Sequence, residues 1–159
     1  MNTQLLVGFL MTLAPISELR GGLPVIVEYC TKKGLSVWPY FAVVLALNIL
    51  VIVLIFLFMD FFHSTFLRFG FYRRFSERVL NKIRIKAQRI EGKMDSWGYL
   101  ALMLFVSIPL PGTGAWTGTL VAWTLGLKRF NSFVAISLGV VLAGFLILFA
   151  SLGFFVTVS

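Results

Sequence analysis

The amino-acid sequence predicts an all-α integral membrane protein, an inverted repeat of a re-entrant helical hairpin plus a transmembrane helix, joined by a basic amphipathic interfacial helix. Charged residues make up only 13% of the 159 positions, whereas a soluble domain carries about 25%. The charge that remains is collected in blocks, which leaves two long uncharged apolar segments and two apolar segments interrupted by proline and glycine. The length suits a single membrane domain over residues 1–159.

The first hairpin is expected at residues 5–30. Its apolar arms, residues 5–13 and 23–29, flank the polar interruption Ala-Pro-Ile-Ser-Glu-Leu-Arg-Gly-Gly at residues 14–22. As helix, each arm would be about 10 to 20 Å long, roughly half of the ~30 Å hydrocarbon core of a bilayer. Proline removes a backbone donor and glycine loosens the chain, so a helix is hard to continue through the break. Two half-length arms around such a break predict a hairpin that re-enters the membrane.

Two segments are long enough to cross a bilayer. Residues 37–59 and 133–156 contain 23 and 24 positions without a charge, which is about 34 to 36 Å of helix. The second segment also contains small residues that allow neighbouring helices to approach closely, namely Gly139, Ala143, Gly144 and Gly153. We therefore expect two transmembrane helices.

The linker between the two halves, residues 60–97, is strongly basic. Nine of the fourteen Lys and Arg residues fall between Arg68 and Lys93. Apolar residues recur there every three or four positions, which predicts a basic amphipathic helix that lies in the membrane interface and contacts anionic lipid headgroups. Because this charge directly follows an apolar span, the positive-inside rule makes the linker cytoplasmic and nucleic-acid binding the weaker interpretation.

The second hairpin is expected at residues 99–125. Apolar arms at residues 99–108 and 115–125 flank the interruption Pro-Leu-Pro-Gly-Thr-Gly at residues 109–114. The order in each half is the same: a broken pair of arms, a Gly-Leu dipeptide (Gly34 and Gly126 are 92 residues apart), then a long span. Two such halves in opposite orientations form an inverted repeat, an arrangement that secondary transporters use.

A second topology competes with the hairpins. Here the broken arms cross the membrane fully as kinked helices, giving four crossings with both termini inside, whereas the hairpin topology places both termini outside. The charge bias separates the two only weakly, because Lys32 and Lys33 fall outside in the hairpin topology while Lys128 and Arg129 fall inside. Both topologies place the two interruptions near mid-depth of the bilayer.

Glu18 and Arg20 are the ionisable residues of the first interruption. A charge this deep in a membrane costs several kcal/mol unless it is paired or wetted, so it marks a functional site; the structural alternative is an ion pair that pins the hairpin. The planar fork of Arg20 suits a phosphate or carboxylate. Glu18 is the candidate for proton coupling, since burial favours the neutral carboxyl group and a nearby arginine favours the charged one.

The second interruption has no charge but offers hydroxyl groups, an indole N–H and the free amides at the start of the following arm, a favourable place for an anion. The alternative role of its glycines is tight helix packing. Gly21, Gly22 and Pro24 are expected to let backbone amides of the first interruption approach a ligand. The candidate substrate-binding residues are Glu18, Arg20, Gly21, Gly22, Pro24, Pro109, Pro111, Gly112, Thr113, Gly114, Trp116 and Thr117.

Other polar residues indicate no catalytic chemistry. His63 has no second ligand nearby, so no metal site is expected, and Ser17 and Ser107 have no histidine partner in their segments. We expect no enzyme activity and no cofactor. Asn48 is expected to hydrogen-bond across helices, and Glu28 and Asp60 are expected to be solvated at segment ends.

The two interruptions carry a family resemblance. Residues 14–24 (APISELRGGLP) and 109–118 (PLPGTGAWTG) resemble the putative small multi-drug export protein family, a distant branch of the DedA/VTT membrane superfamily, over nearly the whole chain. Residues 15–18 are similar to the proline-rich stretch that ends in a glutamate in the first hairpin of that superfamily. DedA proteins typically carry an arginine in the second hairpin, which has none between residues 98 and 127 here; Arg20 would substitute for it.

The resemblance implies two opposed re-entrant hairpins and the movement of lipids. Together with the residues, it predicts a multi-pass transporter of the cell membrane that moves an anionic lipid, such as a polyprenyl (undecaprenyl) phosphate or a phospholipid, with Glu18 able to couple a proton. The alternatives are a proton-coupled exporter of small drugs and a non-transporting membrane scaffold. The expected partners are membrane lipids and, to shield the polar tips, a second copy of the chain.

Overall fold

The computed structural model describes residues 3–66, 91–110 and 112–158, which form six α-helices and no strand. This confirms the all-helical prediction for the described part of the chain. The interior of the predicted basic linker, residues 67–90, lies outside the described residues, and so does Pro111. The amphipathic helix and its cytoplasmic location therefore stay predictions.

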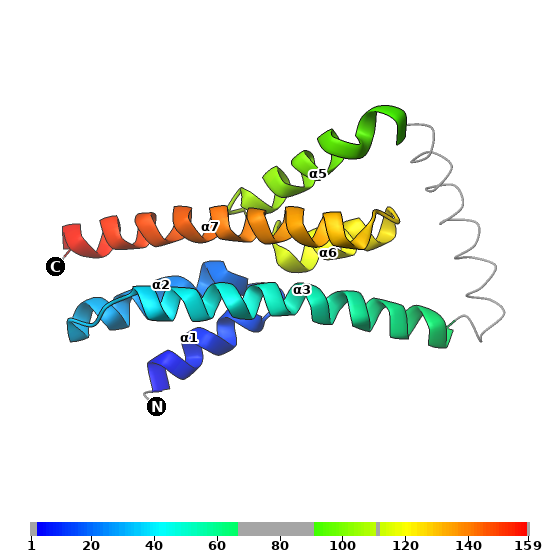
Figure 1. Ribbon diagram of the computed structural model, residues 1–159. Coiled ribbons are helices and arrows are strands. Elements are labelled where there is room, and N and C mark those ends of the chain that lie inside the picture. The colour runs from blue at the N-terminus through cyan, green and yellow to red at the C-terminus, as the bar shows by residue number, and fades with distance from the viewer. Residues whose placement is uncertain (1–2, 67–90, 111, 159) are drawn as a thin grey trace.

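Two long helices form the centre of the bundle. Helix α3 (Trp38–Phe66) and helix α7 (Arg129–Val158) pack against each other and run in opposite directions (Figure 1). Within them, Trp38–Phe62 and Arg129–Phe155 are long and apolar enough to cross a membrane. Helix α3 ends beyond the predicted span 37–59, within the first residues of the expected linker, and α7 begins before the predicted span 133–156.

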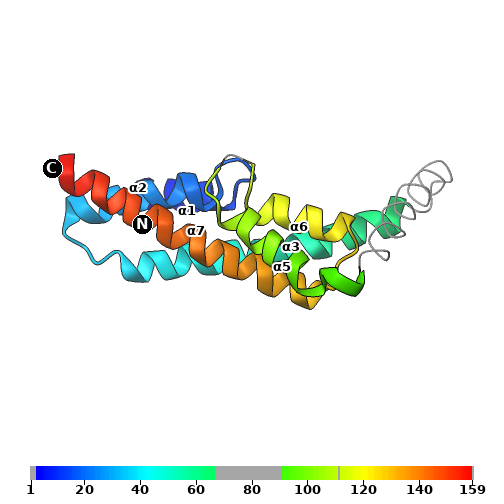
Figure 2. The same ribbon diagram turned by 90° about the horizontal axis from the view of Figure 1, so that it is seen from above.

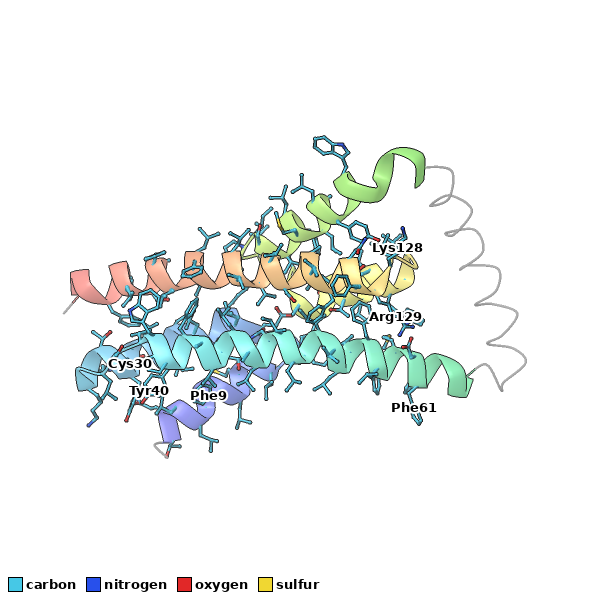
Figure 3. The ribbon with its side chains drawn as sticks, viewed as in Figure 1. Phe9, Cys30, Tyr40, Phe61, Lys128 and Arg129 are labelled. Carbon is cyan, nitrogen blue, oxygen red and sulfur yellow. The ribbon has the colours of Figure 1, made fainter. Side chains whose placement is uncertain are left out.

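Large apolar side chains cover the outer faces of both long helices. Leu57 of α3 is 59% exposed and Phe149 of α7 is 62% exposed, and Phe61 points away from the bundle (Figure 3). A soluble monomer rarely exposes so continuous an apolar surface. The two apolar helices therefore indicate a membrane protein.

The first hairpin consists of helix α1 (Thr3–Leu13) and helix α2 (Glu18–Lys33), which pack closely along each other. The interruption is shorter than predicted: it covers residues 14–17, and Glu18, Arg20, Gly21, Gly22 and Pro24 are helical. Packing explains the difference, because a Cβ atom on Gly22 would collide with Thr12 and with the Gly8 carbonyl of α1. This close approach outweighs the low helix propensity of glycine.

The second hairpin consists of helix α5 (Glu91–Ser107) and helix α6 (Ala115–Thr124), and its arms are held apart. Helix α5 packs mainly on α7, whereas α6 lies against α3 and α7. Gly139 of α7 permits the first contact, since a Cβ atom there would lie 2.6 Å from the Met103 carbonyl oxygen and 2.8 Å from the Cβ of Val106. Helix α5 also begins earlier than the predicted arm, inside the expected linker.

Helices α2 and α6 both end in the same cap. Gly34 and Gly126 adopt left-handed φ angles of 63° and 68°, which glycine reaches without strain. The Leu35 N–H donates to the Cys30 carbonyl (2.9 Å), and the Leu127 N–H donates to the Ala122 carbonyl (3.1 Å). Each Gly-Leu dipeptide thus closes the second helix of its hairpin, 16 residues long in α2 and 10 in α6, and directs the chain into the long helix that follows.

The two hairpins enter the bundle from opposite ends and meet in its middle (Figure 1). Seen from above, the connection of α1 to α2 and the connection of α5 to α6 lie side by side (Figure 2). The chain ends of α1 and α7 are at one end of the bundle, and the ends of α3 and α5 that face the linker are at the other. This arrangement brings the two sequence interruptions together.

Candidate functional site

Glu18 stands at the start of α2 in an unusual backbone conformation. Among the described residues it alone combines a side chain with a positive φ, 45°, and it is only 7% exposed. A left-handed conformation costs a non-glycine residue roughly 1–2 kcal/mol and persists where the surroundings fix it. Here it directs the carboxylate out of its own hairpin and toward the second one.

The Glu18 carboxylate binds the N-terminus of α6. Its Oε1 accepts a hydrogen bond from the Trp116 backbone N–H at 3.0 Å, with a weaker contribution from the backbone of Ala115. The residue before α6, Gly114, provides no side-chain cap. A carboxylate from the other hairpin therefore complements the positive end of the α6 dipole and satisfies amides that the helix itself leaves unpaired.

Gly114 makes room for this carboxylate. Its φ of −150° is accessible to any residue, but a Cβ atom would collide with the carboxylate oxygens of Glu18. Glycine is therefore required here by space and not by backbone conformation. The second interruption is shaped to receive an anionic group at this point.

Arg20 joins the two hairpins beside Glu18. Its Nη2 donates to the Thr113 hydroxyl oxygen at 2.9 Å and to the Ile108 carbonyl oxygen at 3.1 Å, and the Thr113 hydroxyl donates to the Ile108 carbonyl at 2.7 Å. Glu18 and Arg20 form no direct ion pair; each binds the opposite hairpin. The expected alternative, an ion pair that pins the first hairpin, is therefore not the arrangement found.

Asn48 lies at this junction, which the sequence did not reveal. It is 1% exposed, and its Nδ2 donates to the Val44 carbonyl of its own helix at 3.1 Å, whereas a bond across helices was expected. It lines a cavity of about 10 Å³ together with Glu18, Leu19, Arg20, Val106, Gly114, Ala115, Val140 and Ala143, with room for about one water molecule. In the sequence, the available indication of this role was a single amide side chain in the middle of an apolar span.

The remaining candidate residues that the structure describes are not among those that line this cavity. Gly22 packs on α1, Gly112 is exposed with a φ of 84°, and Pro109 lies in the exposed connection. Trp116 and Thr117 stand in the first turn of α6, and the buried Trp116 indole nitrogen has no hydrogen-bond partner. Substrate binding by all of these residues stays a prediction.

A second polar cluster joins α3 to the start of α7. Asp60 accepts hydrogen bonds from both terminal nitrogens of Arg129 and from the Trp123 indole N–H at 3.1 Å. Figure 3 shows Arg129 at this end of α7. Asp60 was expected to be solvated; its side chain is 33% exposed but is also bound by partners more than sixty residues away in the sequence, which were not predicted. In the first half, the ion pair Lys32–Glu28 (2.6 Å) is local to α2.

No metal site is present in the described part of the chain, where His, Cys, Asp and Glu side chains form no cluster of three or more. The side chain of His63 is not among the described groups. The only cysteine of the sequence, Cys30, is buried and unpaired.

Comparison with known proteins yields one family. The family described as "Putative small multi-drug export protein" matches residues 18–146, a stretch that begins at Glu18 and includes the second hairpin, all of α3 and most of α7. No curated protein and no solved structure matches the chain.

Proposed function

Because the chain belongs to the putative small multi-drug export protein family, we propose that it is a transporter that carries an anionic amphiphile past the meeting tips of its hairpins. The observation that carries this proposal is the Glu18 carboxylate on the N-terminus of α6. The chain itself supplies an anion to an anion site, so a substrate phosphate or carboxylate fits the same donors. Transport requires neither enzymatic chemistry nor a cofactor.

The proposed architecture is an inverted repeat with re-entrant hairpins in the cell membrane. The opposite directions of α3 and α7 and the matching caps at Gly34 and Gly126 support it, as do the 11 and 10 residues of α1 and α6; α2 and α5, with 16 and 17 residues, are longer than the predicted half-length arms. In this arrangement the linker is cytoplasmic and both hairpin tips lie near mid-depth. The similarity of residues 15–18 to the first hairpin of DedA/VTT proteins supports a distant relationship with that superfamily.

Glu18 is proposed to act as a tethered competitor of the substrate. When the carboxylate is charged, it occupies the α6 amides and holds the two hairpins together. When it takes up a proton, its attraction to the helix dipole is lost, and the α6 amides become available to the headgroup of the substrate. Arg20 and Thr113 are close enough to contribute further donors to that headgroup.

The test is a flip assay with the full chain in liposomes that contain a short-chain polyprenyl phosphate. A phosphatase added outside hydrolyses only the headgroups that reach the outer leaflet, so the released phosphate reports transport. We expect Arg20→Ala to slow transport about tenfold or more, because a hydrogen bond to a charged group contributes ~1.5–3 kcal/mol and ~1.4 kcal/mol is a factor of ten. Glu18→Gln removes the charge that competes for the α6 amides, so it should change the transport rate and abolish the dependence of that rate on a proton gradient.

The matched control is Glu28→Gln, the same change in a half-buried residue whose ion pair with Lys32 is local to α2. It should transport like the unaltered protein. Unchanged rates in both Glu18→Gln and Arg20→Ala would remove the tip junction from the mechanism.

The family description favours a second candidate, a proton-coupled exporter of small cationic drugs in which Glu18 binds the drug. This candidate predicts that cells expressing Glu18→Gln lose drug resistance while Arg20→Ala, which removes the competing cation, retains it. The anionic-substrate proposal predicts no drug phenotype that depends on the charge of Glu18.

A further inference from the structure

An apolar groove of about 300 Å³ lies between the arms of the second hairpin. Its walls include Ala101 and Phe105 from α5 and Val121 and Leu125 from α6, and no charged side chain lines it. Pockets for small molecules begin at about this size. We call this space the α5–α6 groove.

The groove opens because the two arms diverge from the tip. Near the tip the arms touch, since a Cβ atom on Gly118 would lie 2.6 Å from a methyl group of Val106. Away from the tip, α5 rises away from α7 and from the rest of the bundle (Figure 1). In the first hairpin, by contrast, Gly8 and Gly22 bring α1 and α2 into contact.

The inner end of the groove leads to the tip junction. Phe105 lies one helical turn before Ile108, whose carbonyl oxygen accepts the hydrogen bond from Arg20. A molecule in the groove can therefore place one end near Arg20 and Thr113 while its other end extends toward Leu125.

We propose that the α5–α6 groove holds the apolar chain of a single-chain anionic amphiphile, with the headgroup toward Arg20 and Thr113. This inference rests on the proposed function and adds where the substrate chain lies. Lipid tails are as apolar as the groove, so burial alone gives a chain little reason to leave the bilayer. The headgroup must then determine which amphiphiles bind, and the size of the groove suits a molecule with a single apolar chain.

Photocrosslinking of the full chain in nanodiscs tests the proposal. The probes are two dodecyl phosphates, one with a diazirine beside the headgroup and one with a diazirine at the end of the chain. We expect the first to label residues around Phe105 and the second to label residues around Leu125, and excess unlabelled dodecyl phosphate should remove both signals. Dodecanol carrying the same diazirines should not label the groove selectively.

Groove-filling variants provide the matched comparison. Ala101→Phe narrows the groove from α5 and Val121→Phe narrows it from α6, so each should reduce labelling several-fold. Leu100→Phe is the control, because Leu100 faces the neighbouring space between α5 and α7, and it should be labelled like the unaltered chain. Thermal unfolding in detergent identifies variants that fail to fold. Because the two filling variants narrow the groove from different helices, both should give the same reduction in labelling.

Three results would overturn the inference: labelling spread over the outer faces of α3 and α7, equal labelling by dodecanol, or a reversed order of the two probes. The flip assay with Glu18→Gln is a separate measurement. Altered transport in Glu18→Gln without selective groove labelling would reject the groove and leave the proposed function, whereas selective labelling with unchanged transport would do the opposite.

Discussion

The two hairpins of this molecule each reverse the direction of the chain inside the bundle, but they do so in different ways. In the first, Gly8 and Gly22 press α1 and α2 together, and helix resumes directly after residue 17. In the second, residues 108–110 and 112–114 are not helical, and the arms diverge away from the tip. Both charges of the junction belong to the compact hairpin. The closely packed first hairpin presents Glu18 and Arg20, and the open second hairpin provides the backbone and hydroxyl groups that bind them.

The largest expected effect comes from breaking the compact hairpin. Gly22→Ala places a methyl group on Thr12 and the Gly8 carbonyl, and because these include backbone atoms that cannot rotate away, the cost should be about 3 kcal/mol or more of unfolding free energy, the upper end for overpacking. The measurement is thermal unfolding in detergent. Gly153→Ala is the control, because the space around that Cβ position is open, and it should be neutral or stabilising by about 0.5–1 kcal/mol.

The next effect separates the junction from the hairpins. Gly114→Ala should displace the Glu18 carboxylate from α6 and cost about 1.5–3 kcal/mol of unfolding free energy, the contribution of a hydrogen bond to a charged group. The same substitution should cost clearly less in a Glu18→Ala background, since the collision is then absent. Additive costs in this double-mutant cycle would mean that Gly114 does not make room for Glu18.

A comparison within the second interruption sharpens this result. Gly112→Ala meets no atom within 4 Å but has a φ of 84°, so its cost is backbone strain of roughly 1–2 kcal/mol. That cost should be the same with and without the Glu18 carboxylate. A dependence on Glu18 would show that the whole connection responds to the carboxylate, and not Gly114 alone.

The smallest effect concerns the ends of the two hairpins. Asp60→Asn removes the ion pair with Arg129, a partly exposed interaction that contributes about 1 kcal/mol or less to unfolding free energy. Lys32→Met removes the local pair in α2 and should cost about 0.3–0.5 kcal/mol. Unfolding measured at low and at high salt checks both, because screening should reduce each difference. A larger loss of unfolding free energy for Lys32→Met than for Asp60→Asn would contradict this interpretation, in which only the ion pair of the second half connects two helices of the bundle.

The features that depend on local pattern could be predicted from the sequence. The uncharged stretches that became α3 and α7 are longer than the hydrocarbon core of a bilayer, and each Gly-Leu dipeptide stands between a hairpin and a long helix, as the repeated order predicted. The position of Glu18 and Arg20 in an interruption also marked them as unusual. In each case residues near one another in the chain determine the outcome.

Features that depend on distant contacts could not be predicted in the same way. Gly21 and Gly22 were interpreted as helix breakers, but α1 packs where their side chains would be and keeps them helical. Asp60 carried no sign of Trp123 or Arg129, and Asn48 carried no sign of the cavity it lines. That Glu18 caps α6 is a relation between two hairpins, which spacing along one chain does not encode.

The size of the cavity at the junction has a consequence for bioenergetics. Space for about one water molecule is too small for a hydrogen-bonded file of waters at this point. Under the proposed function, we therefore expect the closed junction to resist the passage of protons. An ion gradient would then be drawn down mainly together with movement of the proposed substrate.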